Sequence, residues 1–257
     1  MIRARKRFGQ HFLHDPGVIR RIVAAIDPLP GDRLVEIGPG LGALTRPLLE
    51  SAGRIEVIEI DRDVVPVLEA HCRGTGSLTV HLADALTVDV AQLAGAGAPL
   101  RLVGNLPYNI STPLLFHLLD AAHVIRDMHF MLQKEVVDRI TAAPGGKDYG
   151  RLTVMLAARC SARRLFHVGP GAFRPPPRVD SAVVRLVPLP AAPFPMPDPQ
   201  RFAAVVAAAF SMRRKTLRNG LRGLVDEHAF AACHIDPGRR PETLAAAEFG
   251  ALAAWSG

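Results

Sequence analysis

Cysteine is scarce in this sequence, with three residues among 257. Cys72, Cys160 and Cys233 lie far apart, and no paired spacing would build a zinc site or a disulfide framework. The histidines show no metal-ligand spacing either. We therefore expect no bound metal, and the cysteine usage favours a reducing compartment.

Long apolar runs are also missing, and none approaches the length that crosses a bilayer. The N-terminus is basic but continues into Phe8-Gly9-Gln10-His11 instead of an apolar segment with a small-residue cleavage site. With 49% hydrophobic and 21% charged residues, the composition is that of an ordinary globular protein. We expect a cytoplasmic protein without membrane attachment.

The charge balance is strongly basic, with a net charge of +7 at pH 7 and a sequence pI near 10.0. A polyanion is the first partner to consider, because neutralising phosphates releases condensed counterions. The arginine-rich composition could equally reflect coding bias, and a basic run is often only a solvated helix face. Two clusters are candidate nucleic-acid contacts. They comprise Arg5, Lys6 and Arg7 near the N-terminus, and Arg213, Arg214, Lys215, Arg218 and Arg222 near the C-terminus.

Between residues 33 and 133, short apolar or β-branched runs alternate with longer helical patterns. This alternation predicts an α/β fold with a doubly wound, mainly parallel sheet. Strands are expected at residues 34–37, 55–60, 78–82, 100–103 and 129–132, with helices that start near 41, 63, 88 and 112. Ligand-binding residues should then lie at the carboxyl ends of the strands.

The remaining chain predicts a change of architecture after residue 187. A helix is expected at 151–162, strands at 164–168 and 182–187, and a rigid loop in the proline-dense stretch 173–180. Residues 188–199 are proline-rich and typical of a linker, and helical patterns follow at 202–210, 215–225, 227–233 and 242–255. We therefore expect a ligand-binding domain over residues 1–187, including a basic N-terminal arm, and a small all-helical, RNA-binding domain over residues 200–257.

A glycine-rich run, Gly38-Pro39-Gly40-Leu41-Gly42-Ala43, follows the first expected strand. Such a turn lets backbone N–H groups approach a ligand, and it suits either a dinucleotide or S-adenosylmethionine. Glu59 stands where an acid would accept both ribose hydroxyls. Glu36 and Asp84 favour the methyl donor, because a carboxylate suits its cationic end and an Asp can accept from an adenine amine. The alternatives are a turn without ligand, an exposed Glu59 and a helix N-cap at Asp84.

A second run, Asn105-Leu106-Pro107-Tyr108, follows the fourth expected strand. The exocyclic amine of adenine is a poor nucleophile because its lone pair is delocalised into the ring. Two acceptors, the Asn105 amide oxygen and a backbone carbonyl at Leu106 or Pro107, would free that lone pair for attack on a methyl group. The Tyr108 ring would stack on the base. The alternative is an Asn-initiated turn with a core tyrosine. Together the two runs favour methyl transfer to adenine.

These motifs resemble the small-subunit (16S) ribosomal RNA adenine N6,N6-dimethyltransferase family over nearly the whole chain. The resemblance is carried by Phe8-Gly9-Gln10-His11-Phe12-Leu13, by residues 36–42, 58–61, 105–111, 132–136 and 173–183, by Asp84 and by Phe210-Ser211-Met212-Arg213-Arg214-Lys215. It implies a Rossmann-like class I methyltransferase that dimethylates two adjacent adenines in a hairpin loop near the 3′ end of small-subunit RNA.

The same resemblance implies S-adenosylmethionine as cofactor, with S-adenosylhomocysteine as product. Its contacts would be His11, Leu13, Gly38, Gly40, Glu59, Asp84 and Asn105. The target adenine would be held by Asn105, Leu106, Pro107 and Tyr108. Phe173 would form a second aromatic wall for the base, or else be a core residue. The family has Asn or His at the position of His11.

Rival interpretations stay open from the sequence. The closest relatives of that family methylate a large-subunit adenine, and an NAD-dependent oxidoreductase would share the glycine turn but leave residues 105–108 unexplained. A non-catalytic RNA-binding or ribosome-assembly protein would keep the fold. The expected partner is small-subunit RNA or an assembling small subunit, with a role in subunit biogenesis, and we expect a monomer.

Overall fold

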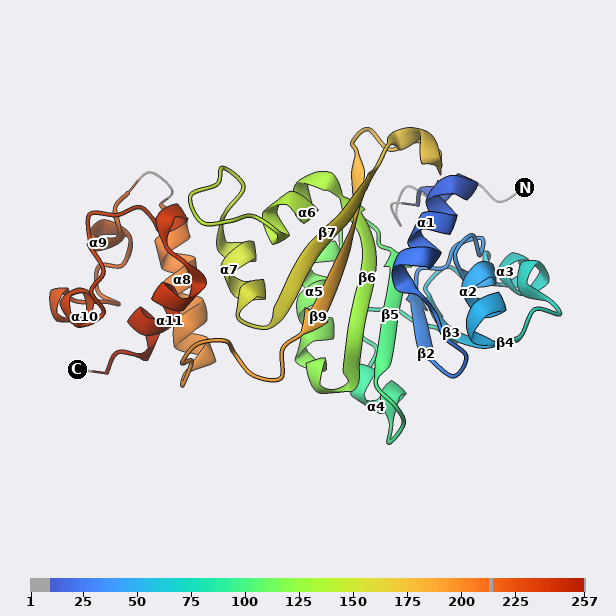
Figure 1. Cartoon of the computed structure of the whole chain (residues 1–257), viewed down its shortest axis with the longest axis horizontal. Coiled ribbons are helices and arrows are strands. Elements are labelled where there is room, and N and C mark those ends of the chain that lie inside the picture. Colours follow the sequence, from blue (N-terminus) through green and yellow to red (C-terminus); the bar gives the residue numbers. More distant parts are fainter. Residues whose placement is uncertain (1–9, 213–214, 257) are drawn as a thin grey trace. The chain divides into compact units, whose positions relative to one another are not determined.

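The computed structural model describes residues 10–212 and 215–256 (Figure 1). Its internal contacts divide the chain into two compact units. The first comprises Met1–Val137 and Arg163–Pro188, and the second comprises Asp138–Ala162 and Leu189–Gly257. The sequence predicts one boundary, within residues 188–199, whereas residues 138–162 also fall in the second unit. The reason is packing, because Val154 and Ala158 belong to the same buried cluster as Phe202 and Phe249.

A seven-stranded sheet forms the centre of the first unit, in the order β4-β3-β2-β5-β6-β9-β7. Its strands are β2 (Arg33–Ile37), β3 (Arg54–Glu59), β4 (Ser77–Leu82), β5 (Leu100–Asn105), β6 (Ile125–Gln133), β7 (Cys160–Val168) and β9 (Ser181–Pro188). Strands β2 to β6 pair in parallel, and β9 is antiparallel to β6. The predicted doubly wound, mainly parallel sheet is confirmed (Figure 1).

Helices connect these parallel strands, as the alternating pattern predicts. They are α2 (Thr45–Ala52), α3 (Val65–Cys72), α4 (Val90–Ala94) and α5 (Ser111–Asp120), followed by the short η2 (Ala122–Val124). The helix expected from residue 41 begins only at Thr45, because residues 41–44 continue the glycine-rich turn. Helix α6 (Lys134–Ile140) follows β6 and is not among the predicted elements.

Helix α1 (Pro16–Ile26) precedes the sheet and is also absent from the predicted elements. Asp15 is its N-cap residue, a start signal that is visible in the sequence. The Asp15 carboxylate accepts from the backbone N–H groups of Gly17 at 2.8 Å and Val18 at 2.9 Å. A short strand, β1 (Phe12–Leu13), precedes α1 in the sequence and pairs antiparallel with β8 (Phe173–Arg174), which gives a two-stranded ribbon. The 3-10 helix η3 (Pro170–Ala172) lies immediately before β8. The ribbon joins the N-terminal segment to the proline-dense loop.

The second unit is helical apart from the start of β7. It contains α7 (Arg151–Ala157), α8 (Pro199–Ser211), α9 (Leu217–Gly220), α10 (Glu227–Ala232), η4 (Pro241–Thr243) and α11 (Ala246–Ala254). Three predicted helices are wrong in length. The one at 242–255 is divided into η4 and α11, because Leu244 and Ala245 between them are extended. The one at 151–162 ends at Ala157 because residue 160 already joins the sheet as β7. The one at 215–225 shrinks to α9, which begins after the extended Thr216 and ends at Gly220; the left-handed φ of 85° at Gly223 also prevents a helix that continues to residue 225. No helix of the described residues is long and apolar enough to cross a membrane.

A buried ion cluster ties α1 to the sheet near the start of β5. The Arg101 guanidinium donates to the Asp127 carboxylate at 3.0 Å and to Asp32 at 2.6 Å. It also donates to the backbone carbonyl oxygens of Ile26 and Asp27, where α1 ends. Arg126 also pairs with Asp32 at 3.2 Å and Arg185 with Asp127 at 3.5 Å, so three cations together neutralise the two carboxylates. Arg101 in addition caps the end of α1, which compensates for its burial.

His129 lies buried beside this cluster, and within the described residues neither of its ring nitrogens makes a hydrogen bond. Burial lowers the pKa of His129 to about 4, although the Asp127 carboxylate favours the charged ring. Between pH 6.5 and 4, His129 is therefore protonated in the unfolded chain but neutral in the folded protein. The free energy of unfolding consequently decreases as the pH falls through this range.

Replacing His129 with Phe should remove this proton linkage. From pH 7 to pH 5 we expect the free energy of unfolding of the original protein to fall by about 2 kcal/mol more than that of His129→Phe. Urea unfolding at both pH values measures the difference. The control is His14→Gln, because His14 is exposed. Equal losses in the original protein and His129→Phe would show that His129 titrates normally in the folded state.

Candidate active site

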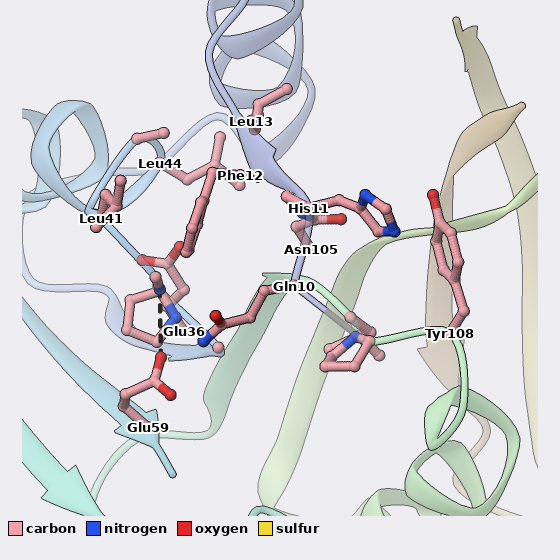
Figure 2. Close-up of a pocket in the computed structure, with 16 residues that line it drawn as sticks. Gln10, His11, Phe12, Leu13, Glu36, Leu41, Leu44, Glu59, Asn105 and Tyr108 are labelled. Carbon is pink, nitrogen blue, oxygen red and sulfur yellow. Dashed lines mark hydrogen bonds between the residues drawn. The ribbon is translucent and has the colours of Figure 1, made fainter. Parts of the chain in front are cut away.

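A pocket opens at the carboxyl ends of β2 and β5, where the strand order of the sheet reverses (Figure 2). This is the place at which open α/β sheets bind ligands, since the connections leave the sheet in opposite directions there. The lining comes from four segments, namely the N-terminal segment, β2 with its turn, the end of β3 and the run after β5. It comprises Gln10, His11, Phe12, Leu13, Glu36, Gly38, Pro39, Gly40, Leu41, Ala43, Leu44, Glu59, Asn105, Leu106, Pro107 and Tyr108.

Glu59 lies directly against the glycine-rich turn at the edge of the pocket, and Figure 2 marks the hydrogen bond between them. The Gly40 N–H donates to Glu59 Oε2 at 3.3 Å, and the Asp61 N–H donates to Oε1 at 2.8 Å. Glu59 is 5% exposed, so it is not a surface carboxylate. Burial raises its pKa, while these backbone hydrogen bonds act in the opposite direction. Each carboxylate oxygen keeps a lone pair that can accept from a hydroxyl of a ligand.

Glu36 lies on the floor of the same pocket and is 2% exposed. Its Oε2 accepts from the Thr45 hydroxyl at 2.6 Å. Burial raises the pKa of Glu36 to about 7; the Thr45 hydrogen bond opposes this shift, and the Glu59 charge adds to it. Two buried carboxylates without a cationic partner in the pocket lining suit a positively charged ligand.

The N-terminal segment covers the turn. The Phe12 ring lies so close to Gly40 that a Cβ atom there would be 3.1 Å from it. The Gln10 amide donates to Asp61 Oδ2 at 3.1 Å. Sequence reasoning names His11 and Leu13 as site residues but assigns nothing to Gln10 or Phe12. Their place in the run Gly9-Gln10-His11-Phe12-Leu13 is the signal that could have found them.

The run after β5 brings an amide and a phenol ring to the pocket. Asn105 Nδ2 donates to the backbone carbonyl of His11 at 2.9 Å, which leaves the amide oxygen as an acceptor. The Tyr108 hydroxyl bonds with the Ser181 Oγ at 2.8 Å, and its ring stacks beside the His11 ring. Burial raises the pKa of Tyr108, against the Ser181 hydrogen bond, so the phenol stays protonated.

Asp84 lies in an adjoining hollow that shares Gly38, Glu59 and Pro107 with the pocket. Its Oδ1 accepts from the Leu86 N–H at 2.9 Å, an Asx turn that orients the carboxylate. The two hollows together bring ten of the predicted ligand-contacting positions to one edge of the sheet. They are His11, Leu13, Gly38, Gly40, Glu59, Asp84, Asn105, Leu106, Pro107 and Tyr108.

Phe173 is not brought to this edge. It is 2% exposed, lies in the core of the first unit and pairs with Leu13 across the β1–β8 ribbon. Its burial agrees with the alternative of a core phenylalanine, and its role as a second aromatic wall stays a prediction.

The predicted RNA contacts are described only in part, since Arg5, Lys6, Arg7, Arg213 and Arg214 lie outside the described residues. Lys215, Arg218 and Arg222 are exposed on the second unit. Arg218 pairs with Glu227 at 2.7 Å, and Arg222 donates to the Asn219 amide oxygen at 3.3 Å. Within residues 10–212 and 215–256, no group of three His, Cys, Asp or Glu residues could hold a metal ion.

Comparisons of the sequence with known proteins all point to one family. Residues 1–255 match the profile of the family described as ribosomal RNA adenine dimethylase. The ribosomal RNA small subunit methyltransferase A of Pseudomonas aeruginosa is 56% identical over 251 residues, which cover 98% of this chain and 94% of that protein. The protein of the same name from Methylococcus capsulatus is 58% identical over 248 residues, 96% of each chain.

Two solved structures are similar over most of the chain. A dimethyladenosine transferase from Plasmodium falciparum aligns with a TM-score of 0.77 at 25% identity, covering 94% of this chain and 96% of its own. The 23S rRNA methyltransferase ErmE aligns with a TM-score of 0.74 at 26% identity, covering 94% of this chain and 98% of its own. Both therefore share the fold over most of this chain.

Gly40 should tolerate no side chain. It has a left-handed φ of 53°, and an added Cβ would press on the Phe12 ring. We expect Gly40→Ala to lower the free energy of unfolding by about 1–2 kcal/mol, as measured with urea. Gly171→Ala is the matched control, because no atom lies within 4 Å of its added Cβ and its φ is ordinary. A similar loss in both variants would contradict a close packing of Phe12 on the turn.

Proposed function

The chain belongs to the ribosomal RNA adenine dimethylase family, and from this membership we propose the following reaction. The protein transfers methyl groups from S-adenosylmethionine to N6 of two adjacent adenines in the 3′-terminal hairpin loop of small-subunit ribosomal RNA. The observation that carries this proposal is the Asn105 amide, which is fixed by the His11 carbonyl beside Tyr108 and next to the glycine turn.

The pocket chemistry fits the proposed cofactor. Glu59 would accept from the ribose hydroxyls, Gly38 and Gly40 would let the backbone approach, and Asp84 would accept from the adenine amine. The buried Glu36 carboxylate would face the cationic end, where a ligand charge relieves the cost of ionising it. Leu13, His11 and Asn105 complete the lining. When bound, the cofactor supplies an electrophilic methyl group on a sulfonium.

The protein's part in the chemistry is to free the N6 lone pair. The Asn105 amide oxygen would accept one amine hydrogen, and a backbone carbonyl would accept the other. Leu106 is the better candidate of the two carbonyls, because that of Pro107 already accepts from the Ile110 N–H at 3.3 Å. Once both hydrogens are replaced by methyl groups, neither acceptor has a partner, and the product loses its hold.

Substrate contacts outside the pocket would come from the basic residues. We place small-subunit RNA, naked or in an assembling subunit, against Arg5, Lys6, Arg7, Arg213, Arg214, Lys215, Arg218 and Arg222. Arg218 would have to exchange Glu227 for a phosphate, which an exposed ion pair permits at small cost. The same proposal makes the protein a cytoplasmic monomer that acts in small-subunit biogenesis.

The rival functions account for less. An oxidoreductase gives no task to Asn105 or to Tyr108. For a large-subunit methyltransferase, the support is the 26% identity between this chain and ErmE. The two small-subunit methyltransferases reported above are 56% and 58% identical to this chain. A non-catalytic assembly factor would have no need for an amide fixed at the pocket.

Methyl transfer from tritiated S-adenosylmethionine to unmethylated small and large ribosomal subunits tests the reaction. We expect dimethyladenosine in small subunits alone, and Asn105→Ala should lower kcat about 10²- to 10³-fold because it removes one of the two acceptors. RNA binding by this variant should persist. Label only in large subunits would assign the protein to the other substrate, and no label in either would leave a binding protein.

Glu59→Gln tests the placement of the cofactor. It replaces a charged acceptor by an amide, so equilibrium dialysis should show S-adenosylmethionine binding weaker by about 10- to 100-fold. Glu69→Gln is the control, because Glu69 is an exposed carboxylate on α3. Unchanged affinity of Glu59→Gln would remove Glu59 from the cofactor site.

A further inference from the structure

We infer that Ser181, the first residue of β9, is a positioning residue for methyl transfer, because its hydroxyl holds the Tyr108 ring in the place where the target base would stack. The inference rests on the proposed function. Sequence reasoning assigns the base to residues 105–108 and gives no task of its own to Ser181. Three features support the inference, namely the bond between the two hydroxyls, the burial of the serine and the attachment of both residues to β6.

The Tyr108 hydroxyl lies 2.8 Å from Ser181 Oγ, and the two groups form a hydrogen bond. Among the described residues, Ser181 Oγ has no other hydrogen-bond partner. Ser181 is 0% exposed, so bulk water cannot replace the phenol. A buried hydroxyl without a partner costs free energy, and this cost favours the orientation of the tyrosine ring that supplies the partner. The bond therefore selects one position of the ring.

The backbone around Tyr108 does not by itself determine where the ring lies. Tyr108 is in a turn between β5 and α5, and the Ile110 N–H closes this turn on the Pro107 carbonyl at 3.3 Å. These contacts fix the chain but leave the two side-chain torsions of the tyrosine to be set by its surroundings. The ring is half-buried at one side of the pocket (Figure 2). A phenylalanine would offer a base the same face, so the hydroxyl contributes the attachment to β9.

Strand β6 is the common support of the serine and of the proposed acceptor amide. Asn105 pairs with Met131 of β6, and the Leu106 N–H donates to the Met131 carbonyl at 3.1 Å. Two residues further along β6, Gln133 pairs with Ser181 in the antiparallel ladder. The bond to Ser181 thus places the stacking ring relative to the Asn105 amide. Such alignment matters because a reacting amine must meet the methyl group in line.

Tyr108→Phe and Ser181→Ala remove the bond from opposite ends and test the inference. With unmethylated small subunits, we expect each variant to lower kcat by about 3- to 10-fold, as for one neutral hydrogen bond. The double variant should be no slower than either single variant, because all three lack the same bond. Tyr108→Phe leaves β9 unchanged, so it tests the bond even where Ser181→Ala fails to fold.

Two binding measurements show which step the bond affects. The affinity for S-adenosylmethionine, from equilibrium dialysis, should change by less than about threefold in all three variants. The affinity for unmethylated small subunits in the presence of S-adenosylhomocysteine should change as little, because phosphate contacts dominate the binding of RNA. The effect is then confined to kcat, as expected for a group that aligns the base.

Urea unfolding separates positioning from the mere pairing of buried polar groups. Tyr108→Phe leaves the Ser181 hydroxyl buried without a partner, so the double variant should be more stable than Tyr108→Phe. For a positioning residue, kcat stays low in the double variant although stability recovers. Two matched controls should keep kcat, Ser77→Ala at the exposed first residue of β4 and Tyr149→Phe in the second unit.

The outcomes separate the inference from the proposed function. Inactivity of the unmodified protein on both ribosomal subunits would overturn the proposed function itself. If that protein is active, unchanged kcat in Tyr108→Phe and Ser181→Ala would overturn the inference alone. Recovery of kcat together with stability in the double variant would also overturn it, because the bond would then serve folding only. Losses that multiply in the double variant would show that the two hydroxyls act independently, and a matching loss of cofactor affinity would move the effect to the cofactor; both results contradict the inference.

Discussion

The site depends on the close approach of β5 to β2 at Gly104. A Cβ atom on Gly104 would lie 2.4 Å from the Ile37 carbonyl oxygen, so any side chain there would push the strands apart. Glu36 pairs with Val103 in this register, and two residues later β2 has passed into the turn at Gly38 while β5 ends at Asn105. The two motifs meet because backbone lies against backbone at this point. A wider spacing would part the amide of Asn105 from the glycine turn.

The N-terminal segment completes the site without belonging to the sheet. It is attached on one side by the pairing of β1 with β8 and on the other by the Asn105 hydrogen bond to the His11 carbonyl. Residues distant in sequence thereby become one constellation, since 94 positions separate His11 from Asn105 and 164 separate His11 from Pro175. Such positions must be held by secondary contacts if the reacting groups are to stay aligned. The ribbon and the proline-dense loop provide them.

The predictability of the molecule follows the range of the interactions involved. Strands β2 to β6 were predictable because each is a short apolar run bounded by a turn signal, and their carboxyl ends located Glu59, Asp84 and Asn105. The pairing of Phe173 with Leu13 was not predictable, because 160 positions separate the two residues. The length of α9 was missed because the helical pattern of residues 215–225 outweighed Gly223, although that glycine is a local stop signal. The division of the chain into units depends on side-chain packing between residues 138–162 and the last helices, which no local pattern encodes.

Buried charge is compensated differently at the two ends of the parallel strands. Near the start of β5, Arg101, Arg126 and Arg185 pair with Asp32 and Asp127, so the charge of these carboxylates is neutralised within the protein. At the carboxyl edge, Glu36 and Glu59 are buried with only neutral donors, and burial raises the pKa of both. Burial raises the pKa of Glu36 to about 7, and a cation bound beside it would lower that pKa and favour the ionised carboxylate. Folding without a ligand therefore favours the neutral form of Glu36, whereas a bound cation would favour its charged form. The carboxylates that cost stability at the pocket are the ones that would favour a positively charged ligand.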